Sequence, residues 1–139
     1  MAAGQSRGTA TSPNMMGVGI ITAAAVVLIL AGVMHAMQGV VGLATNEFFV
    51  VTRQWLFQFD VTTWGWVHVL VGLIGAGTGV AILAGASWAR ILGVIIAAVS
   101  VIANFLWLPY YPLWAVIIIA FDVFVIWALI VSWQDFKNV

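Results

Sequence analysis

Four long apolar runs, separated by short polar or turn-forming stretches, make up most of the chain. Arg90 is the only charged residue between Asp60 and Asp122, and none lies between Arg7 and Glu47. A membrane-crossing helix needs roughly 20 consecutive apolar residues. The runs also lack the alternation of polar and apolar positions that marks a barrel strand. The pattern therefore predicts an all-α bundle of four transmembrane helices, at about 16–41, 62–83, 88–108 and 113–133.

Residues that stop or start helices occupy the boundaries of these runs. Pro13 precedes the first helix, where proline is tolerated. Thr62 and Thr63 are placed to cap the second helix, because their hydroxyls can accept hydrogen bonds from unpaired amides. The 85–87 segment, Gly-Ala-Ser, predicts a tight turn into the third helix. The 109–112 segment carries a proline at each end, which predicts the end of the third helix and the start of the fourth.

Two segments fall outside the predicted helices. Residues 1–14 are rich in Gly, Ser and Thr, and we expect a disordered tail there. Residues 15–139 form a single membrane domain, whose longest connection is the 43–61 loop. The β-branched and aromatic residues of that loop fit a short hairpin or an amphipathic segment lying on the membrane surface. We favour a third interpretation, a lid that closes the outer end of the bundle.

The composition supports a membrane protein. Of the 139 residues, 65% are hydrophobic and 6% are charged, against roughly 25% charged in a typical soluble domain. The four basic residues form no patch that could neutralise nucleic-acid phosphates, so no nucleic-acid partner is expected. The chain has no cysteine, which excludes disulfides, zinc–thiolate sites and iron–sulfur clusters.

The few basic residues indicate an orientation. With four crossings both termini lie on one side, together with Arg7, Arg90 and Lys137, whereas Arg53 lies on the other. Basic residues concentrate in cytoplasmic loops. We therefore expect a multi-pass protein of the plasma membrane with cytoplasmic N- and C-termini and an extracellular 43–61 loop.

Small residues recur on one face of two of the helices. In lipid such residues mark helix interfaces, because they allow close approach of the backbones. Steps of three and four residues place each set on a single helix face, and a short turn makes the two helices antiparallel. We therefore expect the two faces to pack on each other. The expected pairs are Gly79 with Gly93, Gly75 with Ala97, Gly72 with Ser100 and His68 with Asn104. The first helix has a small face of its own, formed by Gly32, Ala36 and Gly39.

Polar residues inside a membrane are costly and are candidates for function by default. This chain places five of them within the predicted helices: His35, Gln38, His68, Asn104 and Asp122. At ~1.5 Å per residue, His35 and His68 lie ~12 Å and ~9 Å from the outer ends of their helices, at a similar level. Asp122 lies deeper, near the level of Ser100.

Four interpretations of this polar cluster remain open. His68, Asn104 and Asp122 could line a ligand or ion pocket that opens to the outside. His35 and His68 could ligate a haem between facing helices. Asp122 could relay protons. The structural alternative is that His68 bonds Asn104 and that Asp122 bonds a neighbouring helix, an interaction worth roughly 0.6–2 kcal/mol.

No motif of a soluble enzyme is present, and no metal site or cofactor is expected. Packing motifs are abundant instead. We therefore expect a non-enzymatic accessory, interaction or self-associating subunit, whose partners are the lipid bilayer and either further copies or a larger membrane complex. The alternative is a small transporter or sensor that uses the outer polar pocket. A haem- or quinone-binding redox protein is a third possibility.

Several stretches together resemble an uncharacterised family of small four-helix membrane proteins from actinobacteria, over roughly residues 15–133. They are Asp60–His68, Trp88–Arg90, Ala103–Phe105, Leu108–Trp114, and Asp122 with Val125–Leu129. The resemblance implies a four-helix plasma-membrane protein and supplies no reaction, substrate or cofactor. His68, Asn104 and Asp122 fall on the matching stretches, whereas His35 does not.

Overall fold

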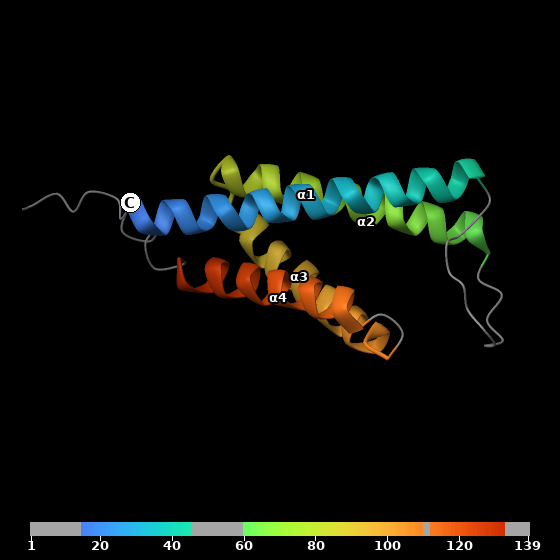
Figure 1. The fold of residues 1–139 in the computed structure, drawn as a ribbon. Coiled ribbons are helices and arrows are strands. Elements are labelled where there is room, and N and C mark those ends of the chain that lie inside the picture. Colours follow the sequence, from blue (N-terminus) through green and yellow to red (C-terminus); the bar gives the residue numbers. More distant parts are fainter. Residues whose placement is uncertain (1–14, 46–59, 110–111, 133–139) are drawn as a thin grey trace, which may run out of the picture.

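The computed structural model describes residues 15–45, 60–109 and 112–132. Within them the chain is all-helical, and four helices follow one another along it (Figure 1). They are α1 (Met15–Thr45), α2 (Val61–Leu83), α3 (Ser87–Trp107) and α4 (Pro112–Val131). Each helix is long and apolar enough to cross a membrane. The expected tail at 1–14 lies outside the described residues.

The predicted loop at 43–61 starts later than expected. Residues 43–45 continue α1, which ends at Thr45 rather than at 41. Thr45 is the first strongly polar position after Gln38, so the apolar run that sustains the helix extends through Ala44. Residues 46–59, which carry the rest of the proposed lid, lie outside the described residues.

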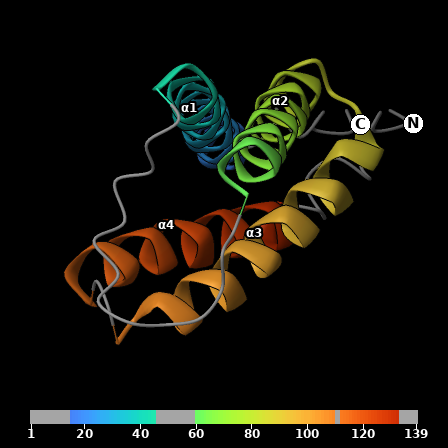
Figure 2. The same cartoon turned by 90° about the vertical axis from the view of Figure 1, so that its right-hand side faces the viewer.

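The helices form two pairs that cross each other. α1 and α2 run antiparallel as one pair, and α3 and α4 form a second pair beneath them (Figures 1 and 2). α2 packs chiefly on α1 and only lightly on α3, while α3 packs chiefly on α4. After the turn at Gly85, α3 diverges from α2 instead of following it (Figure 2).

Local chemistry explains where α2 begins and ends. Asp60 is the N-cap residue, and its carboxylate accepts hydrogen bonds from the backbone amides of Thr62 and Thr63 and from the Thr63 hydroxyl. The expectation that the two threonines cap the helix is therefore wrong, because the acceptor is the carboxylate one residue before the helix. After Leu83, Gly85 adopts a φ of 85°, which favours glycine because it has no Cβ.

The apolar core joins the two pairs near the 83–87 turn. It contains the buried residues Ile21, Ala24, Ala25 and Leu28 of α1, Ile82 of α2, Ala89 and Ala97 of α3, and Val125, Ala128 and Leu129 of α4. Alanines among these residues allow helices to approach, and leucines fill the remaining space. Phe121 and Trp127 of α4 remain about half exposed on the outside, where a lipid environment would suit them.

The close seam of small residues lies between α1 and α2, so the expected seam between α2 and α3 is wrong. A Cβ atom placed on Gly72 would come within 2.5 Å of the Gly32 carbonyl oxygen. A Cβ atom on Gly79 would come within 2.7 Å of the Ala25 carbonyl oxygen. At such spacing only glycine fits. Gly75 lies on the same seam but has room, because its Cβ would be 3.6 Å from the Gly32 Cα atom.

The small residues of α3 have different neighbours from those expected. Gly93 faces the side chains of Leu129, Leu28 and Ile82, and Ala97 is buried in the core. Neither lies on the seam of α2. The expected pairing assumed that helices joined by a short turn stay in contact along their length. Because α3 diverges from α2, the small face of α2 packs on the small face of α1 instead.

Candidate functional site: two polar pairs and an apolar groove

Two histidines meet at the interface of α1 and α2. The imidazole rings of His35 and His68 have centroids 5.5 Å apart and are tilted by 53°. The ring of Trp64, one turn before His68, lies 4.5 Å from the His68 ring. The matching depths estimated from the sequence are therefore accompanied by ring contact between the two histidines.

The hydrogen bonds of the two imidazoles differ. Nδ1 of His68 lies 3.1 Å from the backbone carbonyl oxygen of Trp64. A carbonyl oxygen only accepts hydrogen bonds, so Nδ1 carries the hydrogen, and in the neutral ring Nε2 keeps the lone pair. Nδ1 of His35 is buried and has no hydrogen-bond partner. One imidazole is thus oriented by the backbone, and the other has a ring nitrogen that the surrounding residues do not use.

Close helix contacts flank the histidine pair on both sides. One turn before His35, Gly32 lies against Gly72 and Ala76 of α2. One turn after it, a Cβ atom on Gly39 would lie 2.5 Å from the Gly65 carbonyl oxygen. The backbones of α1 and α2 are therefore fixed at short range around the histidines. This spacing argues against the bis-histidine haem interpretation, because a porphyrin between the rings would have to separate the helices.

A second polar cluster joins α3 to α4. The side chain of Asn104 donates from Nδ2 to the Ser100 carbonyl oxygen at 2.9 Å and to the Ser100 hydroxyl at 3.3 Å. The same serine lies beside the side chain of Asp122 across the helix interface. One carboxylate oxygen of Asp122, Oδ2, is buried without a hydrogen-bond partner. Ser100 thus lies between a carboxyl group on α4 and an amide on α3.

The candidate residues therefore separate into two groups rather than one pocket. His68 contacts His35 and Trp64, whereas the hydrogen bonds of Asn104 go to Ser100. The expected pair of His68 with Asn104 is wrong for the same reason as the expected seam, namely that α3 diverges from α2. Gln38 is exposed and joins neither group. Only the spacing of four residues between Trp64 and His68 could have indicated their contact from the sequence alone.

Arg90 is a buried basic residue. Only 5% of its surface is exposed, whereas the neighbouring Trp88 is exposed. It lies in the first turn of α3, close to the buried Ala89. The Arg90 side chain is thus covered by surrounding protein atoms and does not extend into the surroundings of the bundle.

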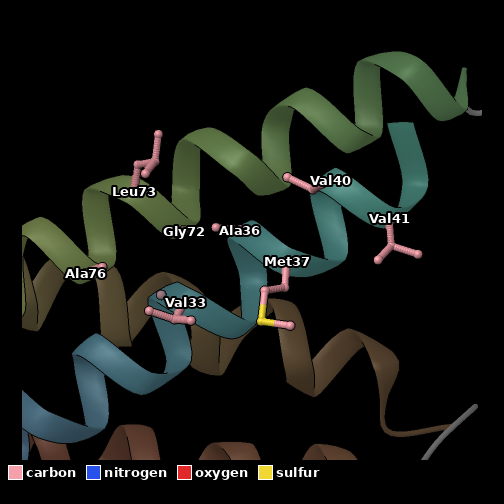
Figure 3. Close-up of a pocket in the computed structure, with 9 residues that line it drawn as sticks. Val33, Ala36, Met37, Val40, Val41, Gly72, Leu73 and Ala76 are labelled. Carbon is pink, nitrogen blue, oxygen red and sulfur yellow. The ribbon is translucent and has the colours of Figure 1, made fainter. Parts of the chain in front are cut away.

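An apolar groove of about 330 Å³ runs along one flank of the α1–α2 pair (Figure 3). All nine residues that line it come from these two helices and are apolar: Gly32, Val33, Ala36, Met37, Val40, Val41, Gly72, Leu73 and Ala76. The small residues of the seam form its floor. Larger side chains such as Met37 and Leu73, both exposed, form its rim. Sequence reasoning found the small residues but not the groove, which depends on the pairing of α1 with α2.

Metal chemistry needs ligands that converge. Among residues 15–45, 60–109 and 112–132, no group of three or more His, Cys, Asp or Glu side chains is placed to hold a metal ion. The histidine pair is the closest approach of imidazoles that the described helices provide. It supplies two ligands at most.

Residues 20–134 match the model of a family described as a domain of unknown function, DUF7144. The match covers most of the chain, and the protein belongs to this family. The matched residues include α2, α3, α4, most of α1 and both polar groups. No curated protein and no solved structure matches the chain.

Proposed function

We propose that the protein is a small multi-pass protein of the plasma membrane with cytoplasmic termini, and that it acts as a non-enzymatic, self-associating subunit. The four long apolar helices support the membrane location. The distribution of basic residues supports the orientation. The resemblance to an actinobacterial membrane family agrees with the membrane location.

The groove on the α1–α2 flank is the observation that carries the proposal of self-association. In lipid, helices associate through close packing rather than through the hydrophobic effect. The groove offers a floor of glycine and alanine, and its rim carries exposed side chains of the size that fills such a floor. A surface with both features allows two copies to pack through the same face about a two-fold axis. A second copy of this chain is therefore the occupant that we propose.

Native mass spectrometry of protein released gently from its own membrane tests this proposal. We expect multiples of the 14.9 kDa protomer. Val33→Trp, on the rim of the groove, should give monomers because the indole blocks the approach of a second copy. Val99→Trp is the control, since Val99 is an exposed valine on α3, away from the groove. It should leave the oligomer intact.

Three outcomes would overturn self-association. One is a monomer for the unchanged protein, and another is an equal loss of oligomer in both variants. The third is a different polypeptide that co-purifies with the unchanged protein and is lost in Val33→Trp alone. That outcome would assign the groove to another membrane protein. A bound small molecule that adds mass to the unchanged protein and to both variants would instead favour the transporter or sensor alternative. The two polar groups are the candidate sites for that alternative.

A further inference from the structure

We propose that the carboxyl group of Asp122 is a proton-binding site inside the membrane. Binding forms one O–H bond at the carboxyl group and removes one negative charge, and no electron is transferred. The proposal is independent of self-association, because Asp122 does not line the groove.

Asp122 lies midway along α4. The helix runs from Pro112 to Val131, and its 20 residues have the length that crosses a bilayer. Asp122 shares a helix face with Val125 and Leu129, which are buried in the core. An ionised carboxylate at this depth is costly, and carboxyl groups inside membranes commonly belong to proton relays. A bound proton removes the charge and with it the cost.

The helices packed on α4 bring few charged or titratable side chains. α4 packs on α3 and on α1. Arg90, the one charged residue of α3, lies about 15 Å along the helix from Ser100. His35, the one titratable residue of α1, contacts His68 of α2. The side chain that acts on Asp122 is the uncharged Ser100, so the positive charge that neutralises the carboxylate must come from a ligand.

The buried oxygen of Asp122 selects that ligand. Oδ2 is covered by protein atoms and has no hydrogen-bond partner. A metal ion with its usual set of oxygen ligands, or a basic side chain of another molecule, would need space at this atom. A proton needs none. The geometry therefore favours a proton over any larger cation.

Ser100 serves the state without the proton. Its hydroxyl accepts a hydrogen bond from Nδ2 of Asn104 at 3.3 Å. That bond uses a lone pair of the hydroxyl oxygen, so the hydroxyl hydrogen remains for the carboxylate beside it. Asn104 is itself held by its bond to the Ser100 carbonyl oxygen at 2.9 Å. A donor to the charged carboxylate stabilises it, which makes loss of the proton reversible.

Infrared spectroscopy of the full-length protein in lipid vesicles at neutral pH tests the proposal. We expect the carbonyl stretch of a protonated carboxylic acid, and a shift of this band in heavy water because the proton exchanges. Asp122→Asn should lose the band. Asp60→Asn is the control, because the Asp60 carboxylate is exposed and accepts hydrogen bonds at the start of α2. It should keep the band.

A hydrophobic carbodiimide gives a second measurement, on the unchanged protein, which decides if Asp122→Asn does not fold. The acid proton moves to a carbodiimide nitrogen while the carboxyl oxygen bonds to the central carbon, so the reagent adds without a leaving group. Peptide mass mapping should find the adduct at Asp122 and not at Asp60.

Four results would overturn the proposal. They are the absence of the band, a band that does not shift in heavy water, a band that persists in folded Asp122→Asn, and an adduct at Asp60 but not at Asp122. Loss of the band when sodium replaces choline in the buffer at constant pH would also overturn it, because the site would then belong to a metal cation.

Discussion

Gly72 and Gly32 face each other across the α1–α2 seam, where a Cβ atom on Gly72 would come within 2.5 Å of the Gly32 carbonyl oxygen. The atom that it would meet belongs to the backbone of α1, which cannot rotate away as a side chain can. This contact fixes the distance between the two helices. The histidine pair and the groove both depend on that distance.

Gly72→Ala should therefore destabilise the protein. Overpacking a close contact costs typically about 1–3 kcal/mol, and here the added methyl group must push the two backbones apart. Gly75→Ala is the matched control, because its Cβ has 3.6 Å to the nearest atom across the seam. Denaturant unfolding in micelles measures both free energies. Equal stability of the two variants would contradict the seam.

Asp60 should make the start of α2 sensitive to acid. Hydrogen bonds from the Thr63 side chain and from the amides of Thr62 and Thr63 hold the pKa of this carboxyl below its ordinary value of 3.8. A lowered pKa means that the cap stabilises the helix above the ordinary value and is lost as the pH falls through the folded value. Amide-exchange protection of residues 62–64 should fall over that range. Asp60→Ala should show the low protection already at neutral pH, whereas protection that does not depend on pH would contradict the cap.

Ser100 and Asp122 should be energetically coupled. In membrane helices a hydrogen bond between side chains is worth roughly 0.6–2 kcal/mol. A double-mutant cycle with Ser100→Ala and Asp122→Ala should give a coupling energy in this range. Thr78 supplies the control, since its hydroxyl donates to the Ile74 carbonyl oxygen within α2. The cycle of Thr78→Ala with Asp122→Ala should give a value near zero, and equal coupling in both cycles would exclude the bond.

The absence of cysteine makes the orientation testable with single cysteines. Ser87→Cys, at the turn between α2 and α3, should react with a membrane-impermeant maleimide only after the cells are opened. Thr62→Cys, exposed at the start of α2, should react in intact cells. Reversed labelling would place the termini outside, and labelling of both in intact cells would exclude the four-crossing topology.

Helix positions were predictable because they depend on local features. Runs of apolar residues and the glycine and proline turns give all four helices to within a few residues of the structure, apart from the longer end of α1. Asp60 was overlooked as a cap because two threonines follow it. The Asp60 carboxylate accepts hydrogen bonds from two backbone amides and one hydroxyl, and its charge makes it a stronger acceptor than a threonine hydroxyl.

Helix partners were not predictable in the same way. Small residues on a face show that it packs closely but not on which neighbour. Both α1 and α3 carry small residues at helical spacing, so the sequence pattern alone lets the face of α2 with Gly72 and Gly79 pack on either helix. In the structure α3 leaves α2 after the turn at Gly85 (Figure 2), and α2 packs chiefly on α1. The pairing of His68 with His35 rather than with Asn104 follows from this arrangement.

Crosslinking in native membranes tests the central claim most directly, that two copies meet through the α1–α2 groove. Val40 lines the groove and its side chain is 55% exposed, so Val40→Cys places a thiol at the proposed interface. Ile102 on α3 lies away from the groove and is 64% exposed, so Ile102→Cys is the control. Under mild oxidation, Val40→Cys should give a reducible dimer of the 14.9 kDa protomer while Ile102→Cys stays monomeric. A Val40→Cys protein that stays monomeric, or an Ile102→Cys protein that crosslinks as strongly, would contradict the claim.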